Sequence, residues 1–327
     1  MRVEISPELY EHEDVAFQLT SLLRLFARGK HEWVILSGHV ALVVGYVERN
    51  DRAVLPITAE LARKASVREA WNDSVTDGDA RFPLTGVKVT KESLENDLAD
   101  LERPAYVVVE NEISDGAFLR AVCRVFGCTD IVRALDQGWA ELVHSGGGGQ
   151  IPQLVEARAG RFRRTVRVAV FMDSDRYRAE ERTKSHKLAD EASEHGARVH
   201  VLRLREIENY VPVRVLESLG SGHQHTVQVE AFQRLDPEQR GFFDMKKGFG
   251  LGVGNTAKGP HAKHQGLYDE LPSEVRDVLR KGFGPELVSK LGALADADAL
   301  TVHDFGGEEG ETTKELRALL GMLRRII

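Results

Sequence analysis

The sequence predicts an α/β protein: a mostly parallel sheet flanked by helices, with an N-terminal α/β addition and a C-terminal, mainly helical addition. Short apolar segments rich in valine alternate with helical patterns between residues 101 and 217. Strands that alternate with helices form parallel sheets that are covered on both faces. The 327 residues are 42% hydrophobic and 29% charged, the balance of an ordinary globular protein. We therefore divide the chain into residues 1–100, 101–217 and 218–327.

The N-terminal region has two helical patterns and one strand-like stretch. Apolar side chains recur at helical spacing over residues 15–27, and residues 58–70 also predict a helix. Residues 33–47 are apolar and β-branched, with breaks at Gly38 and Gly45, so they predict one or two strands. Residues 74–86 are polar and predict a loop. Nothing in this region indicates more than a scaffold or recognition role.

Four strands and three helices are predicted in the central region. The strands cover residues 106–109, 141–144, 167–172 and 198–204, and the helices cover residues 114–126, 151–158 and 182–195. Ser114 is the predicted N-cap of the first helix, and Gly196 ends the third. A run of four glycines, residues 146–149, lies between the second strand and the second helix. Beyond this region, turn formers fill residues 218–225, and residues 271–291 and 312–327 predict helices.

Composition narrows the setting of the protein. Cys123 and Cys128 have no second pair of cysteines, so neither a disulfide framework nor a zinc site is indicated, and we expect a reducing, cytoplasmic location. No apolar run is long enough to cross a bilayer and no signal-peptide pattern is present, so we expect no membrane. The net charge of -7 disfavours nucleic-acid binding through bulk charge, but a local basic surface can still bind it.

Two aspartates, Asp173 and Asp175, follow a buried apolar strand directly. At strand spacing, both carboxylates lie on the same side of the pleat. Like charges that close repel each other, and one is driven toward protonation unless a cation lies between them. Carboxylate oxygens are the ligands that Mg2+ prefers, and Mn2+ accepts the same donors. The pair therefore predicts a metal site.

Further acidic and glycine-rich elements fall at the ends of neighbouring strands. Glu110 follows the first strand, the glycine run follows the second, and Glu206 and Glu208 follow the fourth. Ligands of parallel sheets gather beyond the carboxyl ends of the strands, and the backbone N–H groups of a glycine turn can approach a phosphate. Each element also has a simpler explanation when it is taken alone. Glu110 can be a surface acid, the glycine run a flexible loop, and Glu206 and Glu208 acids that favour the start of a helix. Their coincidence at one sheet edge indicates a site.

This order of elements resembles the TOPRIM fold, in particular the OLD-type (overcoming lysogenisation defect) nucleases. The family has a strand ending in glutamate, a glycine turn after the next strand, a strand ending in Asp-x-Asp, and an acid after the fourth strand. Residues 106–119 (YVVVENEISDGAFL) match the glutamate element, with Asn111 where the family usually has glycine. Residues 204–210 (LREIENY) are similar to the OLD-type arginine–glutamate–isoleucine–glutamate–asparagine element. The likeness covers residues 101–215.

The resemblance implies metal-dependent hydrolysis of phosphodiester bonds in DNA or RNA, with Mg2+ or Mn2+ as cofactor. The sequence leaves the substrate open between the two, and we expect DNA rather than RNA as the nucleic-acid partner. In two-metal sites one cation activates a water and the other stabilises the leaving oxygen. Glu112 and Asp115 both stay open as the second acid of the first loop. The implied metal ligands are Glu110, Asp173, Asp175 and Glu208, assisted by Glu206 or Asp115. The implied partners of the scissile phosphate are Lys246 or Lys247.

The resemblance also implies a protein partner. OLD-type nucleases usually carry or pair with an ABC-class ATPase, but this sequence has no Gly-x-x-x-x-Gly-Lys-Ser/Thr phosphate loop. We therefore expect the effector of a bacterial anti-phage defence system that is gated by a separate ATPase. Whether the protein also forms a homo-oligomer stays open.

Two other interpretations stay open. A phosphatase of the haloacid dehalogenase class would use Asp173 as its nucleophile, but such enzymes usually place threonine or valine where this chain has Tyr177, and carry the aspartate on the first strand. A non-catalytic TOPRIM-like scaffold would bind nucleic acid or a partner without cutting it. The departure from the family pattern at Asn111 keeps this non-catalytic interpretation open, whereas the complete set of acids argues against it.

Overall fold

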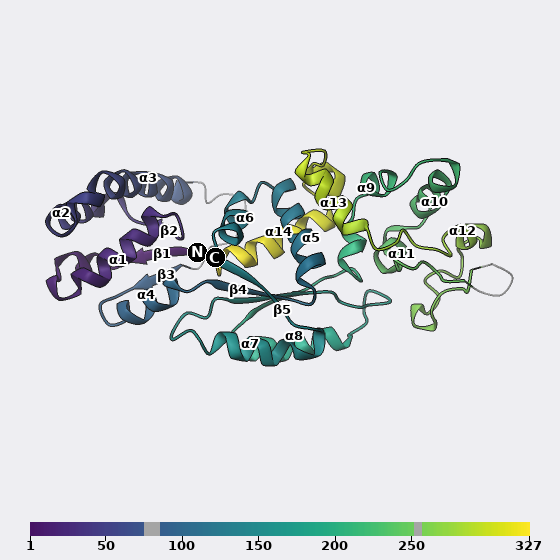
Figure 1. Cartoon of the computed structure of the whole chain (residues 1–327), viewed down its shortest axis with the longest axis horizontal. Helices are drawn as coiled ribbons and strands as arrows, with labels where there is room; N and C mark the ends of the chain where they lie inside the picture. The colour runs from purple at the N-terminus through teal and green to yellow at the C-terminus, as the bar shows by residue number, and fades with distance from the viewer. Residues whose placement is uncertain (75–85, 252–256) are drawn as a thin grey trace.

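The computed structural model describes residues 1–74, 86–251 and 257–327, and it contains two parallel sheets flanked by helices. This confirms the predicted α/β class. Figure 1 shows the N-terminal region at one end, the larger sheet in the middle and the C-terminal helices extending to the other end. None of the helices in the described ranges is long and apolar enough to cross a membrane.

The N-terminal region forms a small sheet of order β2-β1-β3. Its strands are β1 (Arg2–Ile5), β2 (Glu32–Val34) and β3 (Val87–Val89), and its helices are α1 (Ala16–Ala27), α2 (Val40–Asn50), α3 (Leu55–Ser74) and α4 (Leu94–Glu102). The helices predicted at residues 15–27 and 58–70 are confirmed as α1 and α3. The strands predicted over residues 33–47 are wrong beyond β2, because α2 occupies most of that stretch and buries Val43, Tyr46 and Val47 on one face. Most of the loop predicted at 74–86 lies outside the described residues.

The central region forms the larger sheet, of order β5-β4-β6-β7 and parallel throughout. Its strands are β4 (Ala105–Val109), β5 (Ala140–His144), β6 (Val168–Met172) and β7 (Arg198–Val201). The intervening helices are α5 (Glu112–Val125), α6 (Thr129–Asp136), α7 (Ile151–Ala159) and α8 (Lys184–Glu194). All four strands were predicted, although β7 ends three residues earlier than expected. Gly196, with a φ of 80°, ends the α8 segment as predicted.

Helices cover both faces of this sheet, and the strands alternate between two apolar cores. In β6, Ala169 and Phe171 join one core, whereas Val168, Val170 and Met172 join the other. Figure 1 shows α7 and α8 below the sheet and α5, α6, α13 and α14 above it. Burial on both faces explains why the central strands β4 and β6 are continuous apolar runs.

The C-terminal region is built from α9 (Val213–Glu217), α10 (His223–Gln233), α11 (Pro237–Phe242), α12 (Ser273–Val278), α13 (Leu287–Asp296) and α14 (Glu311–Arg324). The helical prediction at 271–291 is confirmed only in part, because α12 and the start of α13 lie there but Gly282 and Gly284 belong to a loop between them. The last predicted helix is confirmed as α14, which packs back on β6 and β7. Single 3-10 turns lie at Pro7–Glu11, Glu13–Val15, Ser37–His39, Arg52–Val54, Gly148–Gln150, Ile207–Tyr210, Ala262–His264 and Val302–Phe305.

One buried arginine ties the regions together. Arg167 is fully buried just before β6. Its Nε donates to Ile326 O at 2.7 Å, and its Nη1 donates to the carbonyl oxygens of Asp100, Leu101 and Arg103 at 3.1, 3.3 and 2.8 Å. Four carbonyl groups, from the last turn and C-cap of α4 and from Ile326 after α14, are thus satisfied by one side chain.

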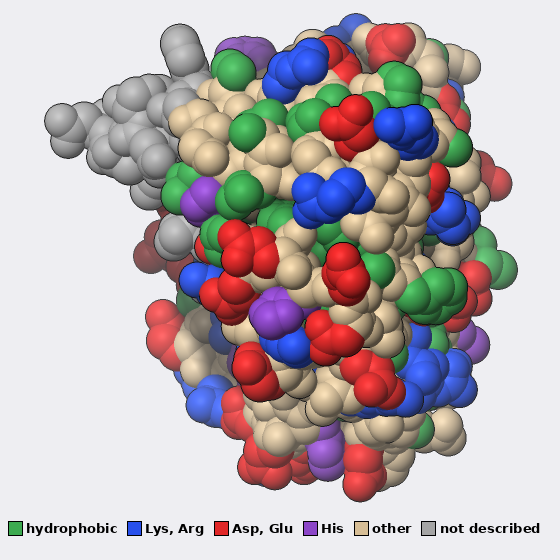
Figure 2. Space-filling view, turned by 90° about the vertical axis from the view of Figure 1, so that its left-hand side faces the viewer, with side chains coloured by type: hydrophobic (Ala, Val, Ile, Leu, Met, Phe, Trp, Pro, Cys, Tyr) green, Lys and Arg blue, Asp and Glu red, His purple; other side chains and the backbone are tan. Residues whose placement is uncertain are grey.

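The outer face of the N-terminal region carries mixed charges. Figure 2 shows acidic and basic side chains interspersed with hydrophobic ones over this end of the molecule. The large hydrophobic side chains exposed here include Phe17, Leu36, Ile57 and Val67. Single exposed apolar residues are common on soluble surfaces, so they do not by themselves mark a binding site.

Candidate functional site

An acidic cleft of about 460 Å³ lies beyond the carboxyl ends of the strands of the larger sheet. The chain contributes to it after β4, β5, β6 and β7, which meet at this edge because they are parallel. Six acids predicted from the sequence line the cleft: Glu110, Asp115, Asp173, Asp175, Glu206 and Glu208. Lys246 is the lysine at the cleft, whereas Lys247 is exposed and absent from its lining.

Asp173 is held at the centre of this acidic group. Its Oδ1 accepts a hydrogen bond from Ile207 N at 2.9 Å, which ties the end of β6 to the segment after β7. Burial raises the pKa of Asp173 well above its usual value, and the negative charges of Asp115, Glu208 and Glu206 raise it further. The ionised form of Asp173 therefore lacks the compensation that a nearby cation would give.

Asp175 reaches the cleft by a turn, and not by the strand alternation that the sequence suggested. β6 ends at Met172, and Asp175 adopts a left-handed backbone with a φ of 54°. The turn is fixed to the segment after β7, because Ser174 N and Asp175 N both donate to Arg205 O, at 3.2 and 3.0 Å. The prediction that Asp173 and Asp175 lie on one side of the same strand is therefore wrong. Both carboxylates nevertheless line the same cleft.

The loop after β4 selects Asp115 over Glu112. Asn111, and not the predicted Ser114, is the N-cap of α5, since its Oδ1 accepts from Ile113 N at 2.9 Å and from Ser114 N at 3.3 Å. Asp115 Oδ2 accepts from Asn111 N at 2.9 Å, and Asp115 is buried at the cleft. Glu112 is exposed on the first turn of α5. The asparagine that departs from the family pattern thus has a structural role.

Lys246 forms two ion pairs at the floor of the cleft. Its Nζ lies 3.0 Å from Glu206 Oε2 and 3.2 Å from Glu208 Oε1. Burial alone would lower the pKa of Lys246, but the charges of the two glutamates raise it above its usual value. For a carboxyl group burial acts in the opposite direction, and it raises the pKa of Glu208. Burial also acts on Glu206, but the charge of Lys246 and a hydrogen bond from Arg205 outweigh it and bring the pKa of Glu206 below its usual value. One ammonium group therefore neutralises only part of the acidic group.

The backbone around Lys246 is set by a second segment of the C-terminal region. Phe283 N donates to Met245 O at 2.7 Å, and Gly284 N donates to Lys246 O at 3.3 Å. A Cβ on Gly248, which has a φ of 70°, would lie 2.3 Å from Leu279 O, so the two backbones can approach only at glycine. This packing directs Lys246, and not Lys247, into the cleft.

The glycine run forms a turn beside the acids. Gly146 and Gly147 line the cleft with φ values of 71° and 127°, which L-residues with a side chain rarely adopt. The turn continues into the 3-10 segment Gly148–Gln150 and then α7. Its place between strand and helix fits the predicted phosphate-facing role, which stays a prediction.

The donor set of the cleft is that of a hard divalent cation. Its side chains offer carboxylate oxygens, and Glu208 Oε2 is buried without a hydrogen-bond partner in the described part of the chain. Within those residues no three His, Cys, Asp or Glu side chains lie as close together as the ligands of a bound metal. The chemistry of the carboxylate donors therefore fits a divalent cation, but in this structure the carboxylates lie too far apart to form a complete coordination shell around one.

An aromatic and basic cluster adjoins the acids and was not predicted. The guanidinium of Arg205 lies 4.4 Å from the ring centroid of Tyr177, and His261 stacks on Tyr177 with centroids 4.6 Å apart. Arg205 Nε also donates to Glu206 Oε1 at 3.0 Å. The only sequence signal was the arginine before Glu206, because Tyr177 and His261 are distant along the chain and no local pattern connects them.

Searches against models of protein families, curated proteins and solved structures found no match to this chain. Its function must therefore be argued from the chemistry of the cleft.

Proposed function

We propose that this chain is a metal-dependent nuclease of TOPRIM-like type, which hydrolyses phosphodiester bonds in DNA or RNA. The observation that carries the proposal is the convergence of six carboxylates, from separate segments of the chain, on one cleft beyond the strand ends. Carboxylates crowded in this way are costly unless cations or protons neutralise them, and the ammonium group of Lys246 reaches only Glu206 and Glu208 among them. The strands present glutamate, glycine turn, Asp-x-Asp and final acids in the order that the resemblance implies.

The residues of the chain have distinct parts in this proposal. Glu110, Asp115, Asp173, Asp175 and Glu208 would hold Mg2+ or Mn2+. When bound, the metal would supply an activated water and polarise the phosphate. Lys246 would offset negative charge at the phosphate, and its ion pair with Glu206 keeps its ammonium group at the cleft. The turn at Gly146 and Gly147 would leave room for a phosphate to approach the backbone.

The test is cleavage of supercoiled plasmid DNA, single-stranded DNA and RNA with Mg2+, Mn2+ or EDTA. We expect metal-dependent cleavage that Asp173→Ala and Glu110→Ala abolish, because each removes a carboxylate that lines the cleft. Glu112→Gln is the matched control, since it removes a carboxylate from the same loop outside the cleft lining. Release of phosphate from p-nitrophenyl phosphate without cleavage of any nucleic acid would favour the dehalogenase-class phosphatase.

One observation favours the non-catalytic alternative. The ammonium of Lys246 already lies between Glu206 and Glu208, where it can stabilise the acids without a metal. A scaffold of this kind would bind nucleic acid equally well with Mg2+ and with EDTA. It would show no cleavage, and its thermal unfolding would not respond to Mg2+ or Mn2+. A metal-dependent rise in unfolding temperature that Asp173→Ala removes would exclude it.

We also propose that a separate ABC-class ATPase gates the nuclease in anti-phage defence. The support is the absence of a phosphate loop in the sequence together with the OLD-type resemblance. Co-expression with an ATPase encoded beside this chain should give co-purification and ATP-dependent control of cleavage. Unrestricted cleavage by the chain alone, unaffected by such an ATPase, would contradict gating.

A further inference from the structure

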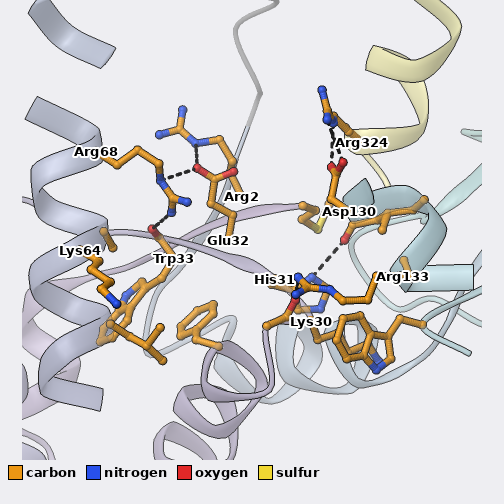
Figure 3. Close-up of a pocket in the computed structure, with 18 residues that line it drawn as sticks. Arg2, Lys30, His31, Glu32, Trp33, Lys64, Arg68, Asp130, Arg133 and Arg324 are labelled. Atoms are coloured by element: carbon orange, nitrogen blue, oxygen red, sulfur yellow. Dashed lines mark hydrogen bonds and ion pairs between the residues drawn. The ribbon is translucent and has the colours of Figure 1, made fainter. Parts of the chain in front are cut away.

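A second cavity, of about 740 Å³, lies between the N-terminal and central regions. The residues that line it belong to the segment between α1 and β2 and to helices α3, α6 and α14. Figure 3 shows Lys64 and Arg68 on the α3 side, with Arg133 and Arg324 on the opposite side. Lys30 follows α1, and its carbonyl partners belong to Glu102 and Arg103, just before β4. The cavity thus lies at the amino ends of the strands, opposite the acidic cleft.

Basic side chains outnumber acidic ones in the lining of this cavity. The basic residues are Arg2, Lys30, Lys64, Arg68, Arg133 and Arg324. The acidic residues are Glu32 and Asp130. A concave surface with one dominant sign of charge concentrates ions of the opposite sign. The excess is notable because the whole chain has a net charge of -7.

Both acids of the lining are already engaged. Glu32 Oε1 pairs with Arg68 Nε at 3.2 Å and with Arg2 Nε at 3.6 Å. Asp130 accepts a two-point contact from Arg324, whose Nε and Nη2 lie 2.7 and 2.8 Å from its oxygens. The carboxylates of the lining therefore do not offset Lys30 and Arg133, whereas Lys64 at the rim pairs with Glu60 on its own helix at 3.2 Å.

Lys30 and Arg133 are held by backbone carbonyls. Lys30 Nζ donates to Glu102 O at 2.5 Å and to Arg103 O at 3.1 Å. Arg133 Nη2 donates to Gly29 O at 3.3 Å, and its guanidinium lies 5.5 Å from the ring of Trp139. Burial lowers the pKa of Lys30 to about 8, and the positive charge of Arg167 contributes to this. Carbonyl groups orient these cations without cancelling their charge, so an anion would be stabilised here.

We propose that this cavity binds a phosphate-bearing small molecule of nucleotide size, with Lys30 and Arg133 as its central phosphate contacts and Lys64 and Arg68 at the rim. Its volume falls in the range of small-molecule sites. Arginine and lysine are the usual partners of phosphate oxygens. Trp139 offers an aromatic face at the same wall. A single pocket of this volume, bounded by two folded regions, favours a small ligand over a nucleic-acid strand, which needs an extended track.

The test is calorimetric titration of the full chain with ATP, pyrophosphate, inorganic phosphate and adenosine. EDTA is present throughout, so that metal-bridged binding in the acidic cleft does not contribute. We expect saturable one-to-one binding of ATP, of pyrophosphate or of both, and no binding of adenosine. Tight binding of both would indicate recognition through phosphate alone, whereas preference for ATP would show that the nucleoside is also contacted.

Variants locate the binding. Lys30→Gln and Arg133→Gln keep a hydrogen-bond donor but lose the charge, and each should weaken binding about tenfold. Lys64→Gln, at an exposed rim position, should weaken it less. Arg63→Gln is the matched control, because Arg63 lies on the same helix outside this lining. Asp173→Asn should leave binding unchanged, since Asp173 belongs to the other cleft. Circular dichroism of each variant verifies its fold.

Several results would overturn the proposal. These are no saturable binding of any phosphate-bearing probe, equal binding by Lys30→Gln, Arg133→Gln and the native chain, or loss of binding in Asp173→Asn. Binding of long oligonucleotides without binding of mononucleotides or pyrophosphate would also overturn it and would assign the cavity to a nucleic-acid track. Because no step uses the acidic cleft, either proposal can fail without the other.

Discussion

Replacement of Lys246 by methionine should destabilise the folded protein by removing the only ammonium group in the acidic cleft lining. Methionine keeps most of the length of the side chain, so the main change is the loss of charge. Lys246 Nζ lies 3.0 and 3.2 Å from two glutamate oxygens. Taken as charge separations at an effective dielectric constant of about 20, these give roughly 5 kcal/mol of attraction each.

Most of that attraction is offset. The Lys246 side chain is 39% exposed, so water screens its charge, and its ammonium group gives up little hydration in the folded protein. The two glutamate side chains, by contrast, are nearly buried. After screening and desolvation, about 1 kcal/mol per contact is a reasonable net value. The variant should therefore lose about 2 kcal/mol of unfolding free energy at neutral pH.

The loss should depend on pH. In the native chain the pKa of Glu206 lies below its usual value, so its stabilising contribution is present above its unfolded pKa and is lost as pH falls through the folded pKa. Burial already raises the pKa of Glu208, and loss of Lys246 should raise it further, so the variant gains stability as pH falls. The difference between the two proteins should therefore narrow from about pH 7.5 to about pH 4.5.

The assay is urea unfolding of both proteins at these two pH values, with Lys247→Met as the matched control. Lys247 is exposed and outside the cleft lining, so its replacement should have little effect. Mg2+ should stabilise the Lys246 variant more than the native chain, and EDTA should reverse this. An equal loss at both pH values, or the same loss in both lysine variants, would refute the reasoning.

Three further predictions concern single residues. Asp173→Asn should raise the unfolding temperature at neutral pH in EDTA, because the raised pKa of Asp173 makes its ionised form costly there; calorimetry should show the gain vanishing as pH falls and Asp173 is protonated. Asp115→Asn should abolish metal-dependent cleavage while Glu112→Gln retains it, since only Asp115 lines the cleft, and equal activity would contradict this. Arg167→Met should lower the unfolding free energy by about 3 kcal/mol in urea unfolding, because four buried carbonyls lose their donor, and a change below about 1 kcal/mol would count against that role.

The two central strands of the sheet that carries the cleft, β4 and β6, could be predicted because they are continuous apolar runs buried on both faces. β4, β5 and β6 lie within one residue of their expected bounds. β1 and β3 have only four and three residues, too few to show a period of two. α2 was read as strand because it is rich in valine and contains Gly45. Its burial of Val43, Tyr46 and Val47 is helical, so packing overrode local propensity.

The acids of the cleft could be predicted by one topological rule, since each follows a parallel strand. The choice between Glu112 and Asp115 could not, because it depends on which residue caps α5. The choice between Lys246 and Lys247 depends on backbone contacts of Gly248 with Leu279, which lie far apart in sequence. Local patterns thus indicated where the site would form, and tertiary contacts decided its members.

The origin of Lys246 also bears on how such a protein can evolve. The sheet and its acids lie within residues 101–217, but Lys246, which neutralises part of their charge, comes from a loop held by the segment between α12 and α13. A gene fragment that encoded only the sheet would carry the acids without this counter-charge. Recombination at residue 217 would therefore transfer an electrostatically incomplete unit, and the C-terminal helices have to be inherited together with the cleft.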